Sequence, residues 1–137
     1  MADIPDFAIG RAGWDNWLIY HAVSQPWPAI DMTPSLPVVH QNHDYTHLPE
    51  GQAHYKVDET YQNTELAGGM RHIYSLLDVQ QRYVNGAVQP AGFSFARLLR
   101  SIERRLQQDE RVGSGWRWHL LRRVRRLRRA VVGAKEG

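Results

Sequence analysis

Residues 10–23 read GRAGWDNWLIYHAV, and this stretch decides the fold that we expect for the first half of the chain. Asp15 would fall in the first turn of a helix there, where the helix dipole favours a carboxylate. Pro26 and Pro28 would stop the helix, so we predict it over residues 13–23. Its apolar residues have the spacing of a helix rather than of a strand: Trp14, Trp17, Leu18 and Ala22.

Shorter elements are expected on both sides of this helix. Residues 58–66 begin with acids and end just before Gly68-Gly69, which is typical of a second helix. The Asn85-Gly86 pair within residues 72–88 is a strong hairpin signal. The sequence therefore predicts a mixed α/β body, with three short strands at residues 7–9, 29–32 and 36–41.

The charge of the chain changes sign along its length. Residues 1–96 hold four Lys or Arg against ten Asp or Glu, a net charge of −6. Residues 97–137 hold thirteen against four, a net charge of +9, and the sum is the overall +3. Because the shift falls close to Pro90-Ala91-Gly92, we divide the chain into a body, residues 1–90, and a basic tail, residues 91–137.

The tail predicts two amphipathic helices separated by residues 112–115. The apolar residues of the first are spaced four, three and four apart: Phe95, Leu99, Ile102 and Leu106. Those of the second are spaced four, four, three and four apart: Trp116, Leu120, Val124, Leu127 and Val131. Seven arginines occupy the other faces of this second helix: Arg117, Arg122, Arg123, Arg125, Arg126, Arg128 and Arg129.

Composition limits the class of protein. A chain of 137 residues allows one domain, and the absence of Cys excludes disulfides and thiolate metal sites. The first ten residues lack the basic flank and apolar core of a signal peptide, and every apolar run is shorter than the roughly 20 residues that cross a bilayer. We therefore expect a cytoplasmic chain.

The WDNW cluster, residues 14–17, places a carboxylate and an amide between two indole rings. A sugar hydroxyl needs a base when it attacks, and the apolar face of a sugar stacks on aromatic rings. Asp15 is thus a candidate general base, with Trp14 or Trp17 as the stacking platform. The alternative is structural, with Asp15 stabilising the helix start and both Trp in the core. Likewise, Arg11 would meet a phosphate or pair with a nearby Asp.

Three histidines, His40, His43 and His47, surround Asp44 in the next polar stretch. Imidazole nitrogen and carboxylate oxygen both suit divalent metals, so these side chains are candidate ligands. The alternative is a hydrogen-bonded loop that braces the fold, a role that Asn42, Asp44 and Tyr45 also suit. Further along, Glu59 and Asn63 lie four residues apart on one helical face, where they would contact an acceptor or remain solvated.

Taken together, these stretches resemble the acceptor-side, C-terminal half of a GT-A-type glycosyltransferase-like family. The resemblance covers roughly residues 4–90 and stops before the tail. It rests on GRAGWDNWLIYHA (10–22), IDMT (30–33), VHQNHDYTH (39–47) and ETYQNTELAGG (59–69).

The resemblance implies a nucleotide-sugar-dependent enzyme of surface polysaccharide synthesis, with Asp15 as catalytic base in an inverting transfer. It implies that His40 or His43 completes a Mn or Mg site beside the diphosphate. In the family the first half binds the donor and carries Asp-x-Asp, a motif that this chain lacks. We therefore expect either a truncated enzyme or one whose donor-binding half a partner chain supplies, and in both cases a chain that is inactive alone. The residues expected at the substrates are Arg11, Trp14, Asn16, Trp17, Asn42, Asp44, Tyr45, Glu59 and Asn63.

The tail suggests a partner of its own. A helix with an initial Trp and dense Arg, residues 116–131, is typical of attachment to an anionic membrane surface, here the inner face. Nucleic acid is a weaker candidate, and packing on the acidic body is a structural alternative. The second function class is thus a non-enzymatic sugar- or phosphate-binding module anchored by this tail.

Overall fold

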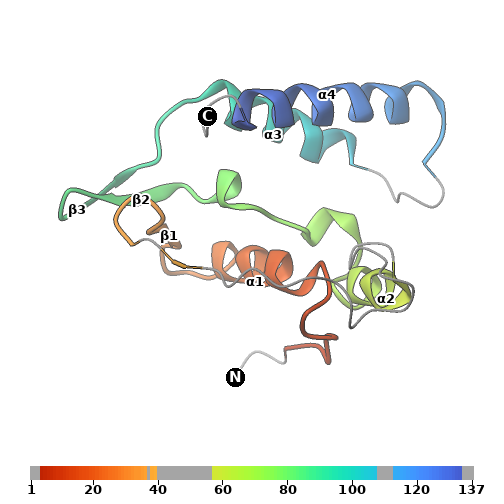
Figure 1. Cartoon of the computed structure of the whole chain (residues 1–137), viewed down its shortest axis with the longest axis horizontal. Coiled ribbons are helices and arrows are strands. Elements are labelled where there is room, and N and C mark those ends of the chain that lie inside the picture. The colour runs from red at the N-terminus through yellow and green to blue at the C-terminus, as the bar shows by residue number, and fades with distance from the viewer. Residues whose placement is uncertain (1–3, 37, 40–56, 108–112, 134–137) are drawn as a thin grey trace.

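The computed structural model describes residues 4–36, 38–39, 57–107 and 113–133 of the chain. Its helices form two layers, with α3 and α4 on one side and α1 and α2 on the other (Figure 1). The elements are α1 (Trp14–Val23), β1 (Ile30–Asp31), α2 (Asp58–Leu66), η3 (Met70–His72), η4 (Leu76–Asp78), β2 (Gln81–Val84), β3 (Ala87–Pro90), α3 (Phe95–Leu106) and α4 (Gly115–Gly133). The described ranges thus form a mixed α/β fold with four helices and one small sheet, and the predicted mixed class is confirmed.

Both helices predicted for the body are confirmed, and their ends follow from local chemistry. α1 starts after Gly13 and ends at Ser24, whose hydroxyl donates to the Tyr20 carbonyl at 2.8 Å. α2 ends in a Schellman motif, in which the Gly69 N–H donates to the Thr64 carbonyl and the Gly68 N–H to the Glu65 carbonyl. Gly68 has a φ of 81°, and an added Cβ would lie 2.7 Å from His72 Nδ1, so this position requires glycine.

The sheet has the order β1-β2-β3, with β1 parallel to β2 and β2 antiparallel to β3. The predicted hairpin is confirmed, because Asn85 and Gly86 both adopt positive φ between β2 and β3. Asp31 ties β1 to β2 through an ion pair with Arg82 at 3.4 Å. The predicted strand at 29–32 is thus confirmed as the shorter β1.

The other two predicted strands are wrong for the described residues. Residues 7–9 belong to no strand, and neither do the described residues of the segment 36–41. The reason at residue 8 is that an amide side chain takes the place of a partner strand. The Asn63 side chain accepts from the Ala8 N–H at 2.8 Å and donates to the Ala8 carbonyl at 3.0 Å.

The two predicted tail helices are confirmed and pack against each other, α3 beginning at a Ser94 cap. Their contact surrounds one acidic side chain, Glu103, whose side chain is 3% exposed. Arg125 and Arg128 of α4 donate to its two oxygens at 3.0 and 2.7 Å. Arg100 of α3 lies 3.3 Å from the same carboxylate.

Arg100 also connects this cluster to the segment between the layers. Its Nε donates to Asp78 of η4 at 2.8 Å, and its Nη2 donates to the Ile73 carbonyl at 2.7 Å. The ion pairs therefore run without a break from α4 through α3 to η4. We call Asp78, Arg100, Glu103, Arg125 and Arg128 the buried ion network.

Two opposing effects act on the pKa of Glu103. Burial by itself would raise the pKa, because it removes water from the charged carboxylate. The charges of Arg128 and Arg100, with hydrogen bonds from Arg128 and Arg125, outweigh burial and lower the pKa below its ordinary value. A carboxyl with a lowered folded pKa stabilises the fold above its unfolded pKa and loses that contribution as the pH falls.

Glu103→Gln is expected to lower the free energy of unfolding by about 3 kcal/mol at pH 7, since it removes the negative charge that Arg100, Arg125 and Arg128 share. It should also make the free energy of unfolding depend less on pH in the acid range. Below the unfolded Glu pKa of about 4.3, wild-type stability should fall more steeply than that of the variant. Urea unfolding from pH 3 to 7 measures both effects. Asp6→Asn, at an exposed carboxyl, is the control, and an equal loss in both variants would contradict the role of Glu103.

Candidate functional site

The start of α1 presents the predicted catalytic carboxylate to solvent. Asp15 is exposed, and one carboxylate oxygen accepts from the Asn16 N–H at 2.9 Å. Trp14 and Arg11, its neighbours along the chain, are partly exposed. The side chains here thus include an accessible carboxylate, an aromatic ring and a cation.

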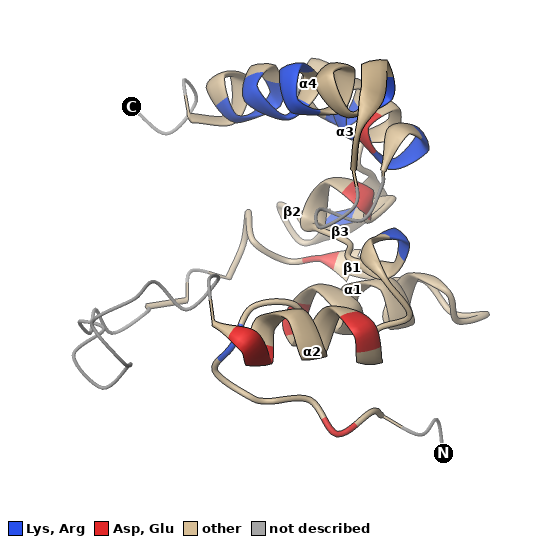
Figure 2. Ribbon diagram, turned by 90° about the vertical axis from the view of Figure 1, so that its right-hand side faces the viewer, with Lys and Arg blue, Asp and Glu red and all other residues tan. Residues whose placement is uncertain are grey.

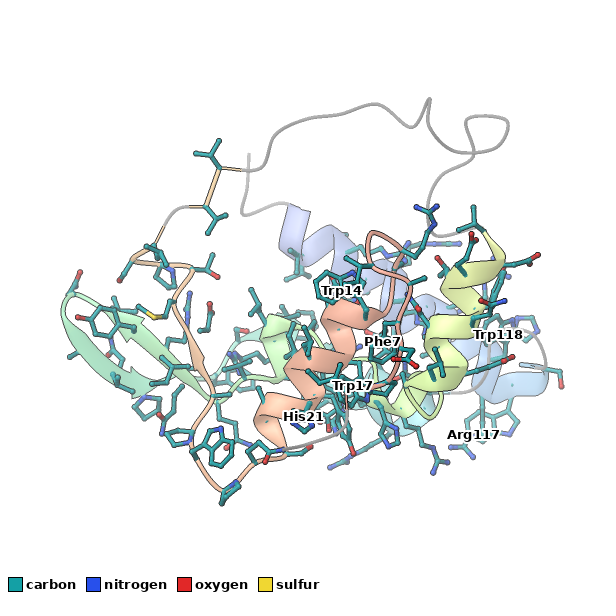
Figure 3. All side chains as sticks on the ribbon, turned by 90° about the horizontal axis from the view of Figure 1, so that it is seen from below. Phe7, Trp14, Trp17, His21, Arg117 and Trp118 are labelled. Carbon is teal, nitrogen blue, oxygen red and sulfur yellow. The ribbon has the colours of Figure 1, made fainter. Side chains whose placement is uncertain are left out.

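The next two predicted residues point into the fold. Asn16 donates to the Tyr74 carbonyl at 2.6 Å, while the Tyr74 N–H donates back to the Asn16 carbonyl at 3.2 Å. Trp17 is buried, with ring centroids 5.2 Å from Phe7 and 5.0 Å from His21 (Figure 3). The structural alternative for Trp17 is therefore the one observed, and Asn16 is engaged in bonds that hold η3 and the following residues against α1.

Asn63 is fully buried and also bonds to the backbone. Besides its two bonds to Ala8, it donates to the Ala12 carbonyl at 3.3 Å. Gly13 brings the start of α1 close to this residue, because an added Cβ there would lie 3.4 Å from Asn63 Cβ. Asn63 thus holds the segment before α1 against α2, whereas Glu59, one turn earlier, is partly exposed.

The remaining predicted site residues lie outside the described residues: Asn42, Asp44 and Tyr45 for substrate, with His40 and His43 for metal. Within the described ranges, no group of three or more His, Asp or Glu side chains is arranged to hold a metal ion. The metal site expected at His40 and His43 therefore stays a prediction.

A second candidate surface lies on α4, whose ribbon is blue along much of its length because it is rich in arginine (Figure 2). Arg125 and Arg128 point inward to Glu103, and the described helix leaves five arginines exposed: Arg117, Arg122, Arg123, Arg126 and Arg129. Trp118 and several of these arginines line a groove of about 400 Å³. Trp116 is 72% exposed, and Leu120 and Leu127 are exposed on the same helix.

Sequence reasoning missed the buried ion network. A signal was present, because Glu103 is the only acid among residues 95–107, which also contain four arginines. An isolated acid in a basic amphipathic helix is a candidate for a buried ion pair.

The helices in the part of the chain that the structure describes include none that is long and apolar enough to cross a membrane.

Comparison of this chain with protein-family models, with curated proteins and with solved structures finds no match.

Asn63→Asp is expected to destabilise the fold by about 3 kcal/mol, because the buried carboxylate cannot donate to the part-buried Ala8 and Ala12 carbonyls and leaves them without this donor. Chemical denaturation measures the change. Gln62→Glu, an exposed neighbour on α2, introduces the same charge and should change stability by less than about 0.5 kcal/mol. A stable Asn63→Asp protein would show that the side chain is free for another role.

Proposed function

We propose that this chain is the acceptor-binding and base-bearing half of a nucleotide-sugar-dependent glycosyltransferase, with Asp15 as the general base. The observation that carries the proposal is the exposed carboxylate of Asp15 at the start of a helix whose next turn is held in place. The resemblance of residues 10–22 to the acceptor side of GT-A-type enzymes supports the same role. The GT-A-like acceptor fold is part of this proposal.

The proposed reaction needs an accessible and well-positioned carboxylate. The acceptor hydroxyl attacks the anomeric carbon of the donor sugar and gives its proton to Asp15. The bond from that carbon to the nucleotide diphosphate breaks, and the diphosphate leaves with the electron pair. Asp15 is accessible to such an acceptor, and partly exposed Trp14 supplies an aromatic ring for the apolar face of a sugar.

The base is held by residues that the structure places inside. Asn16 and Trp17 follow Asp15 directly, and they attach this turn of α1 to Tyr74 and Phe7. A carboxylate on such a turn loses little conformational freedom when the acceptor binds, which favours reaction. Asn16, Trp17 and Asn63 thus support the site by positioning it rather than by touching the sugar.

Two parts of the proposed enzyme lie outside the described residues. The donor-binding half, with the Asp-x-Asp motif of the family, is absent from residues 1–137, so a further segment or another chain would supply it. A Mn or Mg ion is part of the family resemblance, and its expected ligands, His40 and His43, lie outside the described residues. Of the steps above, the proton transfer is the one assigned to a residue of this chain, Asp15.

Asp15→Asn is expected to lower the transfer rate of the reconstituted enzyme by about 10²–10⁴-fold, because the amide cannot accept the proton. The assay combines this chain with a donor-binding half and follows release of the nucleotide diphosphate. Acceptor binding and thermal stability should stay close to wild type.

Asp58→Asn is the matched control, because Asp58 is an exposed carboxylate in the first turn of α2. Each change removes one favourable interaction with a helix dipole, worth about 0.3–1 kcal/mol. Only Asp15→Asn should affect transfer. Equal rates in the two variants would remove Asp15 from the reaction.

The structure also favours a second role, in which α4 attaches the chain to an anionic membrane surface. The buried ion network uses two arginines of this helix, and five others are exposed, as is Trp116. Basic residues near an anionic bilayer contribute about 1 kcal/mol each, and Trp is favoured at the interface. This role suits both the enzyme and the non-enzymatic alternative, a sugar- or phosphate-binding module.

Arg122→Gln combined with Arg126→Gln is expected to weaken binding to phosphatidylserine vesicles by about tenfold or more. Co-sedimentation at low salt measures it, and raising the salt to about 1 M should abolish binding by screening. Arg11→Gln, in the body of the chain, should have little effect. Equal binding to neutral phosphatidylcholine vesicles, or tighter binding to a DNA duplex, would contradict the membrane role.

A further inference from the structure

A cavity of about 660 Å³ lies between η4 and α3, away from the residues that carry the proposals above. Its walls come from η3, η4, the residue before β2, and α3. The lining residues are Arg71, Leu77, Asp78, Gln80, Arg97, Ser101, Arg104 and Arg105. Among the described lining residues there are four cations and one anion, so this part of the lining is strongly positive.

The single anion of the lining is already paired. Asp78 accepts from Arg100 Nε at 2.8 Å and from the Ser75 N–H at 2.9 Å, and Arg104 lies 3.6 Å away. Its side chain is 3% exposed, so it presents almost no surface to a ligand. The carboxylate is therefore part of the buried ion network and does not neutralise the remaining arginines of the cavity.

Three of the four arginines have no such partner within the described ranges. Arg71, Arg97 and Arg105 form no ion pair with a described carboxylate, and Arg71 and Arg105 are exposed. Arg104 is held by Tyr74, whose ring centroid lies 4.1 Å from the guanidinium carbon and whose hydroxyl accepts from Arg104 Nη2. One cation is thus fixed in position and three are available to an anion.

The lining chemistry specifies the class of anion. Guanidinium groups bind phosphate oxygens through paired N–H donors, and the Ser101 hydroxyl and Gln80 amide add neutral donors. Several arginines around one cavity suit an anion with several charges and many oxygens. The described lining residues include one apolar side chain, Leu77, and no aromatic ring on which a base could stack, so they fit a phosphoryl group rather than a base.

We propose that this cavity binds the diphosphate group of a diphosphate ester. The inference goes beyond the glycosyltransferase proposal and does not depend on Asp15 or on membrane binding. Such a group could reach the cavity on a soluble nucleotide or on a lipid, and both present the same oxygens to the arginines.

Inorganic pyrophosphate is the first probe, titrated into the full 137-residue chain by calorimetry. Arg97→Gln and Arg105→Gln should each weaken binding by about tenfold, because each removes a charge-assisted donor. Arg97→Lys keeps the charge but loses the paired donors, so an intermediate affinity is expected. Since the Arg97 side chain has no described ion-pair partner, its variants should retain the wild-type melting temperature.

Arg123→Gln is the matched control, because it removes one exposed arginine of α4 that lines neither this cavity nor the α4 groove. Its effect on pyrophosphate binding should be less than about twofold, as expected for screened surface charges. A loss equal to that of Arg97→Gln would show diffuse attraction to a basic chain and would overturn the proposal. Absence of pyrophosphate binding would overturn it as well.

Uridine diphosphate and farnesyl diphosphate then distinguish the two sources. The ester whose affinity falls in Arg97→Gln but not in Arg123→Gln is the kind of ligand that the cavity takes. Retention of full affinity for both esters in Arg97→Gln would overturn the assignment. None of these readings depends on transferase activity, so failure here and failure of the Asp15 proposal are separate results.

Discussion

The structure depends on one buried carboxylate, Glu103, and on the arginines that neutralise it. Removing a carboxylate from water is costly, and three guanidinium groups offset that cost by direct ion pairs. Two of them come from α4, while Arg100 also binds Asp78 of η4. The same interaction therefore attaches α4 to α3 and α3 to the segment between the layers.

This interaction also divides the arginines of the chain into groups with different roles. Arg100, Arg125 and Arg128 belong to the buried ion network, because they form ion pairs with the carboxylate of Glu103. Others surround the cavity beside Asp78, and a third group lies on the outer side of α4. A net charge of +9 over residues 97–137 is thus not one uniform basic surface. The diphosphate and membrane proposals use different members of it and are independent.

In the layer formed by α1 and α2, amide side chains rather than ion pairs hold the backbone segments together. Asn63 pairs with the backbone of residue 8 as a neighbouring strand would, and Asn16 joins α1 to Tyr74. Amide side chains can do this because each carries both donors and an acceptor. Polar residues that resembled a recognition cluster in the sequence therefore hold the scaffold, and Asp15 is left at its surface.

The sequence by itself determined the helices, the hairpin and the mixed class, because apolar spacing, prolines and the Asn85-Gly86 turn are local signals. It also placed Asp15 in the first turn of a helix, as observed. Tertiary structure decided that residues 7–9 pair with a side chain instead of a strand, and that Trp17 is buried. It alone brought Glu103 to Arg125 and Arg128, which follow it by 22 and 25 residues along the chain. The spacing of apolar residues within one helix does not predict which residues of another helix it will contact.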